Sequence, residues 1–196
     1  MKTWWLLAAL CGLAATSALP AQAGAGPAPS TNPNLAAKLR TAMHEPAGNF
    51  RDVYVRKVWL KLMSERLAPI IAKPQKRRKL LLIVHAQATK AKVPPALVLA
   101  IINTESNFDS WAVSPVGAQG LMQIMPFWLK EAGKPGDNLF NPQTNVRLGC
   151  TILAYYLKRA HGNFTLALQS YYGNRYGIQY SARVLRLLAT RWYWDQ

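Results

Sequence analysis

One glutamate, Glu105, has the sequence context expected of a working acid. It follows a Pro-Pro pair at 94–95, which suits the start of a helix because the first N–H groups of a helix have no partner within it. Apolar residues then recur at helical spacing, at Val98, Ile101 and Ile102. Glu105 continues the same face. We therefore expect a half-buried carboxyl at a helix end, where desolvation raises the pKa toward the range of a general acid.

The segment after this glutamate has the composition of a loop that lines a cleft. Turn formers and small polar residues occupy most of it: Ser106, Asn107, Asp109, Ser110, Ser114, Pro115, Gly117 and Gly120. Loops held by a rigid scaffold commonly carry binding and catalytic groups. An acid on a helix beside such a loop predicts one wall of a binding cleft.

Several short motifs occur in a fixed order after this point, and together they resemble those of the soluble lytic transglycosylase (SLT) family, which has a lysozyme-like fold. The matching pieces are Glu105-Ser106-x-Phe108, Ser114-Pro115-x-Gly117-Ala118-x-Gly120-Leu121-Met122-Gln123-x-Met125-Pro126, Asn138-Leu139-Phe140-Asn141-Pro142, Asn145-Val146-Arg147-x-Gly149 and Ala167-Leu168-x-Ser170-Tyr171. The resemblance extends from about Lys76 to Trp192. It implies a mainly α, lysozyme-like helical domain.

The resemblance also implies a reaction. In this family one glutamate protonates the bridging oxygen of the MurNAc–GlcNAc β-1,4 bond of peptidoglycan. As a carboxylate, it then takes the proton from the sugar's own 6-hydroxyl, which attacks the anomeric carbon with help from the N-acetyl group. A 1,6-anhydroMurNAc end results and no water is consumed, so the enzyme is formally a lyase. Glu105 is the residue expected in both proton roles.

Further site residues are expected from the same resemblance. Ser114 corresponds to a serine near the N-acetyl group, and a simple turn before the next proline is its alternative role. Gln123 and Met125 correspond to residues that touch sugar rings, although Met125 also suits the core. Tyr171 corresponds to the tyrosine whose hydroxyl approaches the catalytic glutamate. The family's Tyr-Asn-Ala-Gly appears here as Tyr-Tyr-Gly-Asn at 171–174, so the turn after Tyr171 must differ.

A hydrolase acting on the same bond usually needs a second carboxylate. The chain has eight acidic residues, and only Asp109 lies near Glu105 in sequence. Turn-forming residues surround Asp109, so we interpret it as a turn or cap residue. A reaction with a single acid avoids the need for a partner.

Helical patterns account for most of the chain, and strand signals are weak. Expected helices cover 34–44, 50–72, 74–92, 96–104, 127–132, 145–161, 164–171 and 179–192, and 117–124 forms at most a small hairpin. The predicted organisation is an N-terminal helical extension over residues 34–75, followed by an SLT-type catalytic domain over residues 76–196.

Two details of these helices can be compared directly with coordinates. The apolar face expected for 50–72 consists of Val55, Val58, Leu62 and Leu67. Asn145 and Asn163 are expected as N-caps, because an asparagine side chain accepts a hydrogen bond from the free N–H groups of the first turn.

The N-terminus has the pattern of an export signal. Residues 1–23 combine Lys2, an apolar run and an Ala-Gln-Ala cleavage pattern, and a membrane anchor is the alternative. Residues 24–33 are expected to form a flexible leader. The predicted location is the periplasm or cell envelope, with no stable membrane span.

Basic residues dominate the charge, which is +16 for the whole chain. Twelve of the 24 lysines and arginines fall between Arg51 and Lys92. This surface is expected either to attract anionic envelope polymers or to be a solvated helix face. For an exported protein, nucleic acid is not expected as a partner.

Cysteine and histidine positions give no sign of a metal site or a cofactor. Outside the predicted signal, Cys150 is the only cysteine, and its place on an apolar helix predicts a small buried residue. The three histidines show no ligand spacing.

Three functions are consistent with these observations. The first is a lytic transglycosylase, and the second is a lysozyme-type hydrolase of the same bond. The third is a non-catalytic cationic protein that binds the cell wall or a membrane. We adopt the first as the working hypothesis.

Overall fold

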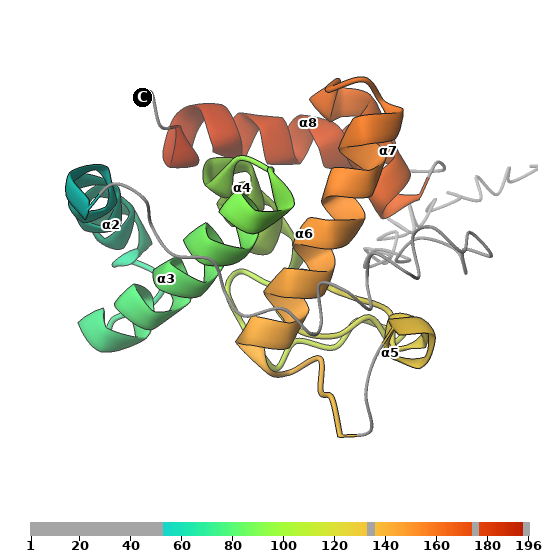
Figure 1. Cartoon of the computed structure of the whole chain (residues 1–196), viewed down its shortest axis with the longest axis horizontal. Helices are drawn as coiled ribbons and strands as arrows, with labels where there is room; N and C mark the ends of the chain where they lie inside the picture. The colour runs from blue at the N-terminus through green and yellow to red at the C-terminus, as the bar shows by residue number, and fades with distance from the viewer. Residues whose placement is uncertain (1–52, 133–135, 174–176, 194–196) are drawn as a thin grey trace, which may run out of the picture.

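The computed structural model describes residues 53–132, 136–173 and 177–193, and over these ranges the chain is built from helices (Figure 1). They are α2 (Val53–Leu67), α3 (Pro74–Ala91), α4 (Pro95–Glu105), α5 (Phe127–Ala132), α6 (Pro142–Arg159), α7 (Phe164–Tyr172) and α8 (Gly177–Leu187), which continues into a π-helical turn, η1 (Leu188–Trp192). In place of strands, these ranges hold isolated antiparallel bridges of Gln119 with Val113 and with Ile124. The predicted mainly α class is confirmed.

Helix α4 forms the centre of the fold. Residues 96–102 are all buried, as expected for a helix that is apolar on every side. Helices α3 and α8 and the turn η1 pack against it. Helix α6 packs between α3 and α7. Figure 1 shows α8 crossing above α4 and α3 lying below it. Glu105 therefore sits at the end of the most enclosed element.

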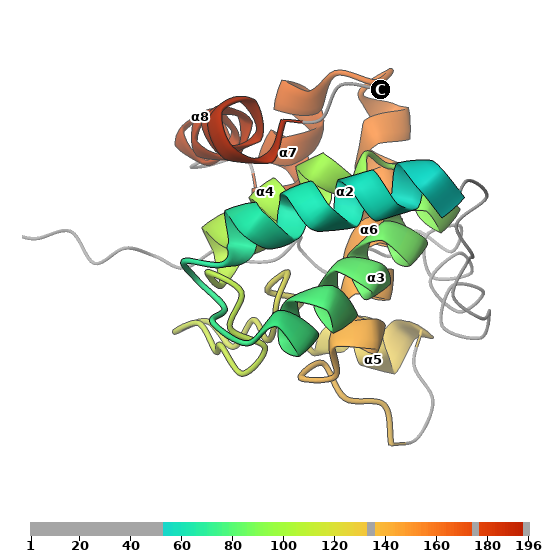
Figure 2. The ribbon, with the colours of Figure 1, turned by 90° about the vertical axis from the view of Figure 1, so that its left-hand side faces the viewer.

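Helix α2 lies alongside α3 on one side of the domain (Figure 2) and also contacts η1. Its buried face matches the predicted one only in part: Leu67 is buried and Leu62 is partly buried, as expected, but the two predicted valines are not. Trp59, Met63 and Leu67 are buried at intervals of four residues, whereas Val55 and Val58 are exposed. The helical spacing of the valines was misleading, because the larger Trp59 buries more apolar area on the adjacent face of the helix.

The predicted cap of α6 is also wrong. Asn141 caps this helix, and its Oδ1 accepts a hydrogen bond from the Gln143 N–H at 2.9 Å. Asn145 lies within the first turn of the helix instead. Asn163 caps α7 as predicted, accepting from the Leu166 N–H at 3.1 Å.

The export signal at 1–23, the leader at 24–33 and the first expected helix at 34–44 lie outside the described residues. Among the described helices, none has the length and apolar character needed to cross a membrane. Cys150 is buried, as predicted. No group of three potential metal ligands occurs in the described part of the chain.

Candidate active site

Glu105 is half-buried at the carboxyl end of α4 and accepts a hydrogen bond from one tyrosine. The Tyr180 hydroxyl donates to its Oε1 at 2.7 Å. Burial raises the pKa of Glu105 to about 7, and this rise is partly offset by the Tyr180 hydrogen bond and by the charge of Arg183. A carboxyl with this pKa can both donate and accept a proton near neutral pH.

The end of α4 is held in place by polar contacts on both sides of Glu105. The Ser106 hydroxyl donates to the Leu121 carbonyl at 2.8 Å, which links the helix end to the loop. On the other side, the Trp192 indole N–H donates to Asn103 Oδ1 at 3.2 Å. These contacts restrict the position of the carboxyl.

The backbone leaves α4 through two left-handed residues. Asn107 and Phe108 have φ of 47° and 66°, and the Phe108 ring packs against Trp192 at 5.4 Å between centroids. Non-glycine residues are uncommon in this region, so the turn depends on the packing around it.

Two tyrosines from α7 and α8 interact with the carboxyl, and a third stacks on one of them. The Tyr171 hydroxyl donates to the Met122 carbonyl at 3.0 Å. Burial, and after it the charge of Glu105, raises the pKa of Tyr171. Tyr171 is therefore close enough to Glu105 to interact with it electrostatically. Tyr172 stacks on Tyr180, with ring centroids 4.3 Å apart and ring planes 17° from parallel. Tyr180, not Tyr171, is thus the tyrosine that hydrogen-bonds to Glu105.

The sequence analysis missed Tyr180, although a signal for it exists. Tyr180 lies four residues before Val184 on the buried face of α8. A buried tyrosine hydroxyl needs a hydrogen-bond partner, and a half-buried carboxylate is a strong acceptor. Its sequence separation from Glu105, 75 residues, hid the pairing.

Residues 112–126 form the loop beside Glu105, and two predicted site residues shape it. Ser114 is buried, and its hydroxyl accepts from the Ala118 N–H at 2.9 Å. Gln123 has φ of 49° and donates through Nε2 to the carbonyls of Ala112 and Gly120 at 3.2 and 3.0 Å. Met125 is partly buried against the core. Both Ser114 and Gln123 therefore stabilise the loop itself.

Asn145 joins this loop to α6. Its Oδ1 accepts from the Met122 N–H at 2.8 Å, and its Nδ2 donates to the carbonyls of Gln119 and Leu139 at 2.8 and 2.9 Å. The Met122 backbone is consequently bound from both sides, by Asn145 and by Tyr171. This buried amide explains why Asn145 is unavailable as a cap.

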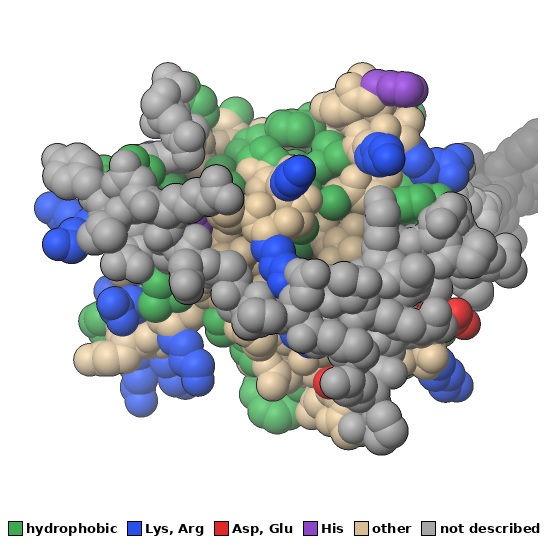
Figure 3. All heavy atoms as spheres, in the orientation of Figure 1, with side chains coloured by type: hydrophobic (Ala, Val, Ile, Leu, Met, Phe, Trp, Pro, Cys, Tyr) green, Lys and Arg blue, Asp and Glu red, His purple; other side chains and the backbone are tan. Residues whose placement is uncertain are grey.

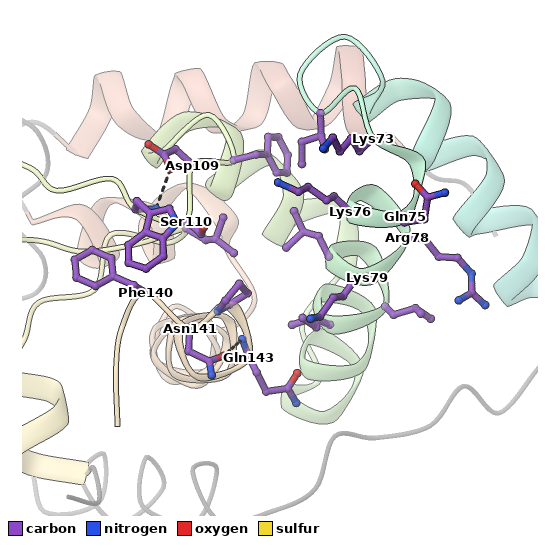
Figure 4. A pocket seen from close by; sticks show the side chains of 18 of the residues that line it. Lys73, Gln75, Lys76, Arg78, Lys79, Asp109, Ser110, Phe140, Asn141 and Gln143 are labelled. Carbon is purple, nitrogen blue, oxygen red and sulfur yellow. Dashed lines mark hydrogen bonds between the residues drawn. The ribbon is translucent and has the colours of Figure 1, made fainter. Parts of the chain in front are cut away.

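A large cavity of about 1290 Å³ lies between the first turns of α3 and the loops at 108–111 and 138–143 (Figure 4). The lining contains neither Glu105 nor any other predicted site residue. Asp109 lies there, and its Oδ1 accepts from the Trp111 N–H at 2.8 Å, as in the turn expected from the sequence. Because Lys73, Lys76, Arg78 and Lys79 also line this space, we call it the basic cavity.

Residues 83–179 match the family model described as the Transglycosylase SLT domain. This part of the chain is an SLT domain. The matched range begins within α3 and ends within α8, so it contains Glu105, the 112–126 loop and Tyr171.

Curated relatives carry transglycosylase names. The Transglycosylase of Enterobacteria phage PRD1 is 32% identical over 100 residues, which cover 51% of this chain and 37% of that protein. Two proteins named membrane-bound lytic murein transglycosylase C are also similar. The one from Mannheimia succiniciproducens is 35% identical over 39% of this chain and 24% of its own length. The one from Yersinia pestis is 32% identical over 53% and 30%.

The SLT-domain chain thus spans less than two fifths of the length of each of these relatives. Among solved structures, an inactive mutant of the lytic transglycosylase Slt from Pseudomonas aeruginosa is 24% identical. That match covers 81% of this chain and 32% of the other with a TM-score of 0.44, a likeness too distant to carry weight.

Proposed function

We propose that this SLT-domain protein is a lytic murein transglycosylase that cleaves the MurNAc–GlcNAc β-1,4 bond of peptidoglycan and leaves a 1,6-anhydroMurNAc end. The observation that carries this proposal is Glu105, a desolvated carboxyl with a pKa of about 7 and one tyrosine donor. The names of the relatives support the same substrate.

In the first step, protonated Glu105 gives its proton to the glycosidic oxygen. The bond between this oxygen and the anomeric carbon breaks, and the GlcNAc leaves with a new hydroxyl. The positive charge that develops at the anomeric carbon is stabilised by the substrate's own N-acetyl group. Burial of Glu105 favours this step, because it keeps the acid protonated at a pH where an exposed glutamate has lost its proton.

In the second step, the Glu105 carboxylate takes the proton of the MurNAc 6-hydroxyl. The oxygen of that hydroxyl bonds to the anomeric carbon and closes the anhydro ring, so the carboxyl returns to its starting state. The carboxylate formed between the two steps is stabilised by the Tyr180 hydrogen bond and by the Arg183 charge. Tyr180 therefore acts on the same carboxyl in both steps.

The remaining predicted residues act on the substrate from the loop side. Ser114 accepts a hydrogen bond from Ala118, and its own hydroxyl proton, which has no acceptor within the described chain, is donated to the substrate's N-acetyl oxygen. We propose that Gln123 and Met125 form the part of the wall that touches sugar rings. Tyr171 fixes the position of this wall, because its hydroxyl donates a hydrogen bond to the Met122 carbonyl.

A hydrolase with two carboxylates is the main rival. Besides burial, the groups that shift the pKa of Glu105 within the described chain are Tyr180 and Arg183, and neither is an acid. Asp109 faces the basic cavity instead. This favours the single-acid reaction.

The products of digestion test the proposal. Purified peptidoglycan incubated with the protein should release muropeptides with anhydro ends, which are lighter than the products of hydrolysis by the mass of one water. Glu105→Gln should abolish release, whereas the matched variant Asp109→Asn should retain it. Reducing ends in the products would establish the hydrolase, and full activity of Glu105→Gln would leave only a binding role.

We also propose that the protein acts in the periplasm or cell envelope after removal of residues 1–23. Its partner there is the peptidoglycan glycan strand, and the basic surface between Arg51 and Lys92 attracts anionic envelope polymers. Cell fractionation combined with N-terminal sequencing of the mature protein tests the location. A cytoplasmic protein that keeps residue 1 would contradict it.

A further inference from the structure

The basic cavity has one strongly positive wall. Lys73, Lys76, Arg78 and Lys79 contribute to its lining, and among the described residues Asp109 is the only acid there. Figure 4 shows Lys76 and Lys79 extending from α3 toward the opposite wall. In the space-filling view, lysines and arginines gather at the lower left, where α3 begins (Figure 3). The lining thus carries an excess positive charge.

The positive wall is prearranged by an arginine that lies outside the lining. Arg77 donates to Ser64 Oγ at 3.0 Å and to the carbonyls of Ile71 and Ala72 at 2.8 Å each, which fixes the 68–73 turn against α3. Lys73, Lys76 and Lys79 do not hold the turn in this way. All three are exposed and form no ion pair within the described chain. Their charges are therefore available to a ligand.

The opposite wall is aromatic and also fixed. Trp111 is 70% exposed and stacks on Phe140, with ring centroids 5.3 Å apart and an angle of 24° between the planes. Asp109 and Asn138 accept hydrogen bonds from the backbone N–H groups of these two aromatic residues at 2.8 and 2.7 Å. A large aromatic surface held open to solvent is typical of a recognition site.

Between the walls the lining is apolar. Leu80 and Leu121 are buried, and Ile70, Ile71 and Ile83 are partly buried against the core. An occupant that fits this cavity has negative groups along one side and apolar groups on the other. At about 1290 Å³, the space exceeds that of a typical small-molecule pocket.

We propose that the basic cavity binds an acidic peptide segment of a partner protein. Lys76 and Lys79 lie about one turn apart on α3, and Lys73 is the N-cap residue just before it, so the three charges follow one another along this wall. Successive side chains of an extended peptide point to opposite sides. A peptide that alternates acidic and apolar residues therefore presents carboxylates to the lysines and apolar side chains to the floor. Trp111 covers its other side.

Two other occupants fit less well. A flat lipid surface cannot enter a concave site to reach Leu80 and Leu121. A neutral glycan would stack on Trp111 but would leave the lysines without partners. The lysines and Trp111, on which the proposal rests, lie apart from Glu105 and Tyr180, and only Leu121 and Phe108 border both sites. The proposal therefore holds or fails independently of the proposed reaction.

Binding of fluorescein-labelled peptides to the purified full chain tests the proposal. A set of ten-residue peptides in which Asp or Glu alternates with Leu or Phe is titrated by fluorescence anisotropy, beside counterparts with Lys in place of the acids. The cavity variant Lys73→Gln/Lys76→Gln/Lys79→Gln is compared with a control of equal charge, Lys57→Gln/Lys61→Gln/Lys158→Gln. The control lysines are exposed and lie outside the cavity.

We expect the acidic peptides to bind and their Kd to rise about tenfold in the cavity variant and less than twofold in the control. Binding should also shift the tryptophan emission to shorter wavelength, and Trp111→Phe should remove that shift.

Three results would overturn the proposal. Equal weakening in the two triple variants would mean that only the overall charge matters. Acidic peptides that bind no better than their Lys counterparts at low salt would exclude a site of this chemistry. Binding of soluble muropeptides or anionic vesicles, without binding of the acidic peptides, would assign the cavity to one of those ligands.

Discussion

Replacing Glu105 by glutamine should stabilise the protein at neutral and alkaline pH, even though it removes the proposed acid. Burial raises the pKa of Glu105 from 4.5 to about 7, and Tyr180 and Arg183 offset this rise only in part. Between these two pH values the folded chain binds more protons than the unfolded chain. Stability from this group is therefore complete below pH 4.5 and is lost as the pH rises through 7. Glutamine has the same shape and no proton to lose.

The size of the effect follows from the same values. One pKa unit corresponds to about 1.4 kcal/mol, so ionising Glu105 in the folded state costs about 3 kcal/mol once the pH exceeds 7. Glu105 is half-buried and the solvent can relax around it, so we expect a measured gain of about 1–3 kcal/mol at pH 8 relative to pH 4. The Tyr180 hydroxyl can still donate to the glutamine carbonyl, so the variant keeps this hydrogen bond.

Urea unfolding at a series of pH values from about 4 to 8 measures this gain. Glu65→Gln, at an exposed glutamate on α2, is the matched control and should follow the unmodified protein throughout. A free-energy difference between Glu105→Gln and the unmodified protein that stays flat with pH would refute the reasoning. A difference that grows toward acid pH would refute it equally, because it would mean that the folded state favours the ionised carboxyl.

Three further outcomes are expected. Tyr180→Phe removes a hydrogen bond that lowers the pKa of Glu105, so the alkaline limb of kcat/KM should move up by about one pH unit; an unchanged limb would contradict the contact. Gly120→Ala should destabilise by more than about 2 kcal/mol in urea unfolding, since its Cβ would lie 2.4 Å from a backbone carbonyl oxygen, whereas Gly117→Ala, with the same sign of φ and open space, should cost about 1 kcal/mol. Burial raises the pKa of the Cys150 thiol, so maleimide should label it, by peptide mass mapping, only after unfolding; labelling of the folded protein would show that the helix opens.

The helices were largely predictable because their signals are local. The ends of α3, α4, α5 and α7 fall within two residues of the predicted ones, since proline, glycine and asparagine mark them. The face of α2 was not predictable from spacing alone, because Trp59 competes with Val55 and Val58 for the same core. The cap of α6 failed for a related reason: Asn145 is held by backbone groups far away in sequence.

For the site, the local sequence predicted the position of Glu105 but not the residues that surround it. The apolar face of α4 fixed the half-buried position of Glu105, because burial of this helix follows from its own composition. Tyr180 lies on a different helix and its contact depends on how α8 crosses α4, which no local pattern encodes. The basic cavity could not be predicted for the same reason, since its walls come from α3 and from two loops that meet only in the folded chain.

The proposed reaction requires one carboxyl that both gives and takes a proton, and such a group needs a pKa close to the working pH. The fold gives Glu105 a pKa of about 7 by opposing two effects. Burial at the end of α4 alone would make the carboxylate costly to form, and the second proton transfer would slow. Full exposure would leave the acid ionised at neutral pH, and the first transfer would fail. Helix α8 supplies both of the groups that lower the pKa, Tyr180 and Arg183, so the packing of α8 on α4 sets the balance. The pKa of Glu105 is therefore a property of this helix pair, and substitutions that shift α8 should change the pH profile of the proposed reaction before they change the fold.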